Sequence, residues 1–138
     1  MSLVAGVRNP NGKCVDEQNC DFERWTVCAF DKQSMDVRVK FLDCLDTPWT
    51  DDLTVQKVKA CANQTQGINP GKMEQCYAGA RGDDLLEEAS KMFTAAYPKP
   101  VYMPRTRVQG VDVDADYDDV KKALCAAGAA APVCSNLE

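Results

Sequence analysis

The chain has 138 residues, a formal net charge of −5 and 45% hydrophobic residues. This length and apolar fraction predict a single domain with a buried core. The acidic balance disfavours nonspecific nucleic-acid binding, because contacts to phosphates need clustered Lys and Arg. No apolar run reaches membrane-spanning length, and residues 1–9 lack the apolar region of a signal peptide. We therefore expect no nucleic-acid partner and no membrane span.

The cysteines are the most informative residues. There are 8 of them and no histidine, and no two cysteines are spaced as C-x-x-C. An even and dense set without histidine is typical of a disulfide framework rather than a zinc site. We predict no metal, no cofactor and no Cys-His or Ser-His-Asp catalysis. The expected disulfide residues are Cys14, Cys20, Cys28, Cys44, Cys61, Cys76, Cys125 and Cys134.

Two further patterns bear on compartment and metal binding. Disulfides persist in oxidising compartments, and Asn63-Gln64-Thr65 is an N-glycosylation sequon, which suits a secreted chain with a glycan on Asn63. The acidic run at residues 112–116 resembles a calcium loop. However, Tyr117 stands where such a loop needs Gly, and Ala123 stands where it needs a bidentate Glu. A strand end followed by a helix cap is the simpler interpretation.

Residues 3–7 form a short apolar run that predicts a strand. Helical spacing begins at Asp21 and continues in separate segments to about Ala96. The segment 35–45 also shows some alternation, so a strand stays open there, but we prefer a helix. Asn69-Pro70 predicts a helix start, because Asn caps helices and Pro suits the first helical position.

After Ala96 the hydrophobic period changes from helical to two. Residues 105–114 predict a β-hairpin that turns at Gln109-Gly110. Asp114 or Asp116 then caps a last helix over residues 116–127. The expected fold class is α+β, with a large helical region before the hairpin.

Four segments carry further information through their order: Cys20 to Cys28, Cys76 to Leu85, Tyr102 to Gly110, and Cys125 with Cys134. In this order they resemble the gamma-interferon-inducible lysosomal thiol reductases (GILT). The first resembles the end of the family signature E-C-x-x-N-x-x-x-x-C, the second its C-x-x-G-x-x-G-x-x-L stretch, and the third its Y-V-P-W-V-x-V-N-G segment. The fourth matches the family's C-terminal cysteine pair.

The chain also departs from the family pattern. The signature opens C-Q-H-G, but here Val15-Asp16-Glu17 follows Cys14. Glu23 replaces the signature Asn, and Arg105 stands at the family's Trp. The family's first strand, its C-x-x-C and the helix behind it have no counterpart. The resemblance therefore implies an incomplete thioredoxin-like fold with a large disulfide-linked helical insertion over about residues 21–96.

The resemblance implies that the whole protein reduces disulfides of protein substrates in the secretory or lysosomal route, while this chain itself holds no catalytic residue. It also implies a cis Met103-Pro104 bond whose backbone binds substrate. The simpler interpretation is a proline that starts an edge strand. The alternative function is a redox-inactive secreted binding module. A third interpretation is a purely structural helical domain. A missing strand would leave an open sheet edge, which predicts strand swapping or a homodimer.

Disulfide pairing is only partly constrained. Cys14–Cys20 and Cys125–Cys134 are expected to be short structural clips. The other four cysteines allow three pairings, and nothing in their spacing selects one. We take Cys28–Cys76 with Cys44–Cys61 as the working choice.

Overall fold

The computed structural model describes residues 14, 20–47, 54–99 and 106–136. Contacts group the chain into two compact units, residues 1–100 and residues 101–138. The single-domain prediction stays a prediction, because compact grouping does not establish that either unit folds alone. Within the described part the fold is mostly helical with one two-stranded sheet, which agrees with the expected α+β class. The expected strand at residues 3–7 lies outside the described residues.

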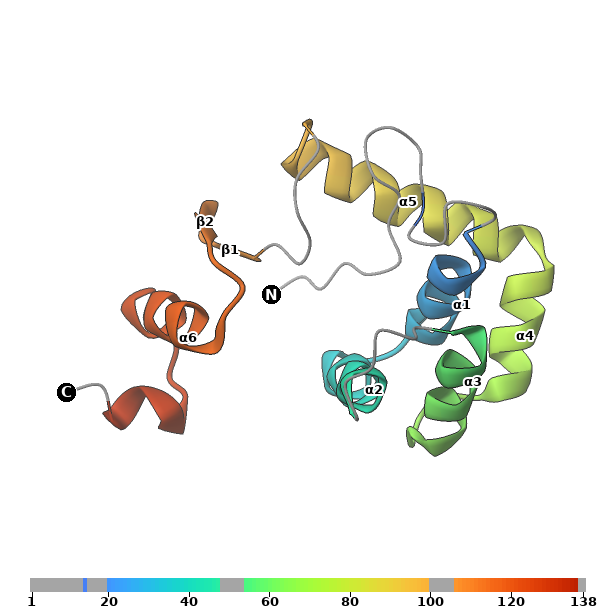
Figure 1. The fold of residues 1–138 in the computed structure, drawn as a ribbon, viewed down its shortest axis with the longest axis horizontal. Helices are drawn as coiled ribbons and strands as arrows, with labels where there is room; N and C mark the ends of the chain where they lie inside the picture. The colour runs from blue at the N-terminus through green and yellow to red at the C-terminus, as the bar shows by residue number, and fades with distance from the viewer. Residues whose placement is uncertain (1–13, 15–19, 48–53, 100–105, 137–138) are drawn as a thin grey trace. The chain divides into compact units, whose positions relative to one another are not determined.

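The larger unit is a cluster of helices around α1 (Figure 1). Helix α1 contacts α3, α4 and α5, and every residue from Trp25 to Phe30 is buried. Six consecutive buried residues cover all sides of a helix, so α1 is a central element rather than an amphipathic surface helix. Among its described residues the helices are α1 (Asp21–Phe30), α2 (Met35–Asp46), α3 (Val55–Gln64), α4 (Pro70–Ala78) and α5 (Ala80–Ala96).

Side-chain caps determine where three of these helices begin. The side chains of Ser34, Thr54 and Asn69 accept hydrogen bonds from backbone N–H groups of the first turns of α2, α3 and α4. Each cap pairs a donor that has no partner inside its helix. The expected Asn69-Pro70 start is confirmed. The segment 35–45, for which a strand was left open, is helical, and it buries Phe41 and Leu45.

Aromatic contacts tie α1 to its neighbours. Trp25 stacks on Tyr77 of α4, with ring centroids 4.0 Å apart and an interplanar angle of 6°. Lys59 belongs to α3, and its ammonium group lies 4.2 Å from the centroid of the Trp25 ring. Phe30 meets Phe41 of α2 edge to face at 6.1 Å. These pairs connect α1 to three different helices.

Four disulfides use all eight cysteines, and they are the two expected clips and the two pairs of the working choice. Cys28–Cys76 joins α1 to α4 across 48 residues, and Cys44–Cys61 joins α2 to α3 across 17 residues. Loop-closure entropy alone gives such bonds about 4 and about 3 kcal/mol of stabilisation. Cys14–Cys20 and Cys125–Cys134 close short loops of 6 and 9 residues. The two long-range bonds therefore constrain the helix packing, and the two short ones act locally.

The smaller unit is a hairpin followed by a helix. Strands β1 (Thr106–Val108) and β2 (Val111–Val113) pair antiparallel, with Val108 opposite Val111. The turn residues Gln109 and Gly110 both have positive φ, 49° and 82°, as in turns whose twist suits a hairpin. Helix α6 (Tyr117–Ala126) begins at the Asp116 cap, and Cys125–Cys134 fastens it to the 3₁₀ turn η1 (Pro132–Asn136).

Gly82 allows α5 to begin close to α1 and α4. It is a buried residue in the first turn of α5. A Cβ atom there would lie 2.7 Å from Nε of Arg24 and 2.9 Å from the carbonyl oxygen of Cys76. Arg24 is itself held, because its guanidinium donates to the Gly79 carbonyl oxygen at 2.9 Å and pairs with Asp83 at 3.0 Å. A side chain at position 82 therefore has to displace fixed groups.

We expect Gly82→Ala to lower the free energy of unfolding by about 1–3 kcal/mol, the usual cost of overpacking. Gly71→Ala is the matched control, because the added Cβ meets only Oδ1 of Asn69, at 3.4 Å. That control should leave stability within about 1 kcal/mol, since replacing Gly in a helix also restricts the unfolded chain. Denaturant unfolding of the oxidised proteins measures both. Equal midpoints for the two variants would contradict the close approach at Gly82.

Candidate functional site: a cationic pocket beside the Cys28–Cys76 disulfide

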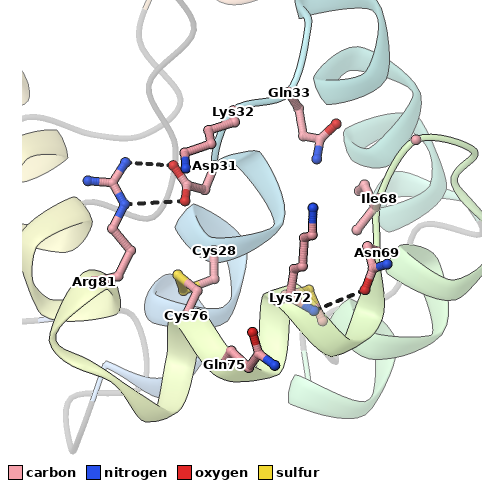
Figure 2. A pocket seen from close by; sticks show the side chains of 12 residues that line it. Cys28, Asp31, Lys32, Gln33, Ile68, Asn69, Lys72, Gln75, Cys76 and Arg81 are labelled. Atoms are coloured by element: carbon pink, nitrogen blue, oxygen red, sulfur yellow. Dashed lines mark hydrogen bonds and ion pairs between the residues drawn. A yellow bond between two sulfur atoms is a disulfide. The ribbon is translucent and has the colours of Figure 1, made fainter.

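The larger unit contains a pocket of about 600 Å³. Its walls come from the C-terminal end of α1 with the residues that follow, from the segment leading into α4, from α4 itself and from the start of α5 (Figure 2). This volume lies in the range of sites that hold small molecules. The pocket brings together residues 28–33 and 67–81, which are far apart in sequence.

One wall of the pocket contains the Cys28–Cys76 disulfide. Cys28 is 4% exposed and Cys76 is 7% exposed. The bond is thus mostly enclosed by the helices that it joins, and the pocket is where it approaches open space. Disulfide exchange begins when a thiolate reaches one of the two sulfur atoms. A thiolate would therefore have to approach the Cys28–Cys76 bond from the pocket.

Two lysines give the pocket its positive character. Lys32 follows α1 and Lys72 lies in the first turn of α4, and both are exposed. Both side chains line the pocket, and Figure 2 shows them extending in different directions, Lys72 toward Gln33 and Lys32 toward Asp31. Lys ammonium groups bind oxyanions as mobile point charges. Amides of Gln33 and Gln75 add neutral donors and acceptors.

An ion pair closes one side of the pocket. Arg81 holds Asp31 with two contacts, Nη2 to Oδ1 at 2.6 Å and Nε to Oδ2 at 3.2 Å. This hydrogen bonding lowers the pKa of Asp31 below its ordinary 3.8, and the charges of Arg81, Lys32 and Arg38 act in the same direction against partial burial. Asp31 is therefore ionised near neutral pH, and both oxygens of its carboxylate accept hydrogen bonds from Arg81.

Gly67 shapes another part of the pocket wall. Its φ is +108°, and a Cβ atom there would lie 3.0 Å from Cγ2 of Val37. Only glycine adopts this backbone conformation without strain. The loop is further held at Thr65, whose hydroxyl donates to the Cys61 carbonyl oxygen at 2.8 Å. The loop before α4 thus packs closely against α2 and leaves the pocket open beside it.

The residues predicted from the sequence fall in different places. Met103 and Pro104 lie outside the described residues. Asn63 is exposed at the end of α3, where a glycan has access, while Thr65 of the same sequon is buried. The sequence interpretation missed Lys32, Lys72 and the Asp31–Arg81 pair. Single charged residues at such separations carry no recognisable spacing, so only the fold reveals this cluster.

Some kinds of site are not found in the described part of the chain. No group of three or more His, Cys, Asp or Glu side chains is placed to hold a metal ion there. None of its helices is long and apolar enough to cross a membrane. No cysteine is free. Four disulfides indicate folding in an oxidising compartment.

Comparison with known proteins gives no assignment. No protein-family model matches the chain, and no curated protein matches it closely enough to count as a relative.

We expect Arg81→Gln to raise the pKa of the Asp31 carboxyl toward its ordinary value, because the largest cause of its lowering is the hydrogen bond from Arg81. A lowered folded-state pKa stabilises the protein above the unfolded value near 4, and this contribution is lost as pH falls through the folded value. The variant should therefore have a lower free energy of unfolding than wild type at neutral pH. The difference in unfolding free energy between the two proteins should become smaller in acid. Carboxyl NMR titration and pH-dependent unfolding measure the two effects.

Arg107→Gln is the control, because Arg107 pairs with Asp112 in the smaller unit at 3.0 Å. It should leave the Asp31 titration unchanged. An Asp31 pKa that is the same in wild type and Arg81→Gln would contradict the assigned cause.

Proposed function

We propose that this chain is part of a GILT-like thiol-disulfide oxidoreductase that reduces disulfides of protein substrates. The chain supplies the disulfide-linked helical region, the hairpin and the last helix, and itself carries no C-x-x-C. The observation that carries the proposal is spatial: two of the four resembling segments, Cys20 to Cys28 and Cys76 to Leu85, meet at the Cys28–Cys76 bond.

Contacts around that bond support the same proposal. Both glycines of the segment Cys76 to Leu85 contact the Arg24 side chain. Arg24 donates a hydrogen bond to the carbonyl oxygen of Gly79, and Gly82 has no side chain that would collide with Arg24. Glu23, which replaces the signature Asn, is 1% exposed, so this position holds an interior polar group. Residues that the resemblance singles out therefore have packing roles in one place.

The thioredoxin-like part of the proposal rests on the order of elements. Helices α1 to α5 precede the β1–β2 hairpin, and α6 follows it with its Cys125–Cys134 clip. In such a fold Met103 and Pro104 would bind an extended substrate segment through backbone hydrogen bonds. Secretion or lysosomal delivery, with a glycan on Asn63, belongs to the same proposal.

A redox-inactive binding module is the second candidate. It is favoured by one specific observation, which is that all eight cysteines are paired and none is free. A module of this kind keeps the framework and acts through its surface. A homodimer or strand exchange through the sheet edge that a missing strand would leave open also stays a prediction, and light scattering on the purified chain measures it.

The native gene product decides between the two candidates. We expect protein purified with an antibody against the helical unit to have a mass larger than this chain and to reduce a denatured disulfide-linked substrate. Alkylation after mild reduction should abolish that turnover, because the attacking group is a thiolate. The recombinant chain of 138 residues is the control and should show no turnover. A native protein of this chain's mass without turnover would overturn the oxidoreductase proposal and leave the binding module.

A further inference from the structure

The pocket beside Cys28–Cys76 concentrates positive charge in an acidic chain. The net charge of the chain is −5, but the ionic groups that line the pocket are Asp31, Lys32, Lys72 and Arg81. Arg81 and Asp31 neutralise each other through their two contacts. Two ammonium groups thus remain to attract a negatively charged ligand.

The position of Lys72 adds to this preference. It lies in the first turn of α4, a helix of 9 residues whose Asn69 cap accepts from the Lys72 N–H at 3.0 Å. Helix N-termini carry partial positive charge. The side chain of Lys72 and the N-terminus of α4 therefore favour an anion in the same sense, and Lys72 lies one helical turn before Cys76 on the same side of α4.

The same pocket presents a group that can react. Cys76 is slightly more exposed than its partner Cys28, at 7% against 4%. Nearby ammonium groups stabilise thiolates, both the one that attacks a disulfide and the one that leaves. Cys44–Cys61 offers an internal comparison, because neither of its residues lines the pocket.

We propose that this pocket admits a small thiol carrying a carboxylate or another oxyanion, and that this thiol opens the Cys28–Cys76 disulfide. Lys32 and Lys72 hold the oxyanion, and the amides of Gln33 and Gln75 hydrogen-bond the body of the ligand. This reaction goes beyond the proposed function, and it does not depend on membership of the GILT family.

The exchange balances with two molecules of the ligand. The thiolate of the first attacks Sγ of Cys76, a mixed disulfide forms, and Cys28 leaves as a thiolate. The thiolate of the second attacks the ligand sulfur of the mixed disulfide and releases the ligand disulfide. Two electrons pass from two ligand thiols to the protein, and Cys28 and Cys76 become thiols after taking up protons.

The test compares three small thiols on the oxidised full chain. These are 2-mercaptoethanesulfonate, which is anionic, 2-mercaptoethanol, which is neutral, and cysteamine, which is cationic. Opening of each disulfide is followed by acid quench, alkylation and peptide mass mapping, and each rate is divided by the thiolate concentration. We expect the anionic-to-cationic rate ratio at Cys28–Cys76 to exceed that at Cys44–Cys61 by at least about fivefold, the effect of one unit charge at contact distance in water.

Variants then assign the preference to the pocket. The double variant Lys32→Gln and Lys72→Gln should lower the anionic-to-cationic rate ratio at Cys28–Cys76 to the value found at Cys44–Cys61. The control is the double variant Lys91→Gln and Lys122→Gln, which changes the net charge equally but outside the pocket. It should keep the higher ratio at Cys28–Cys76. Raising the ionic strength should shrink the excess in wild type, because salt screens exposed charges. The wild-type comparison stands even if a variant fails to fold, since both disulfides lie in one molecule.

Two results would overturn the proposal. One is an anionic-to-cationic ratio that is equal at the two disulfides of the wild-type chain. The other is an excess ratio that survives in the folded Lys32→Gln and Lys72→Gln variant, because the charge preference would then arise elsewhere. The failure of this test is separate from the oxidoreductase proposal, which concerns turnover of protein substrates by the native gene product.

Discussion

The burial of α1 on all sides is the constraint on which the larger unit depends. Residues 25–30 have no face left for solvent, so α3, α4 and α5 must surround this helix. Trp25 binds it to α4 by stacking on Tyr77, and Cys28 binds it to the same helix covalently. The end of α1 therefore lies against the last turn of α4. Lys32, which follows α1, and Lys72, which lies one turn before Cys76, then border the same pocket.

This arrangement gives the Cys28–Cys76 bond two roles. As a crosslink across 48 residues it restricts the unfolded chain more than the other three disulfides do. As part of the pocket wall it also borders the space that we propose admits a small thiol. Opening the bond would remove the longest covalent constraint from the helix that organises the unit. The proposed exchange therefore predicts that stability and thiol chemistry are coupled at one position in this protein.

Local signals in the sequence predicted much of the fold. Asn69-Pro70 fixed the start of α4 because capping chemistry is local, and the alternating period after Ala96 predicted the hairpin. The burial of Glu23 and Thr26 was not predicted, because the helical spacing of apolar residues from Asp21 onward describes one helix face only. The pocket was missed for a different reason: Asp31 and Arg81 are 50 residues apart, and only tertiary packing joins them.

Native-state hydrogen exchange of the oxidised chain tests the central position of α1 most directly. Amides that open only with global unfolding exchange most slowly. We expect the amides of residues 25–30 to be the slowest of the larger unit, slower than those of α5, although α5 is the longest helix in the described part of the chain at 17 residues. Faster exchange in α1 than in α5 would contradict the central position of α1, because α1 could then open while the helices around it stay folded.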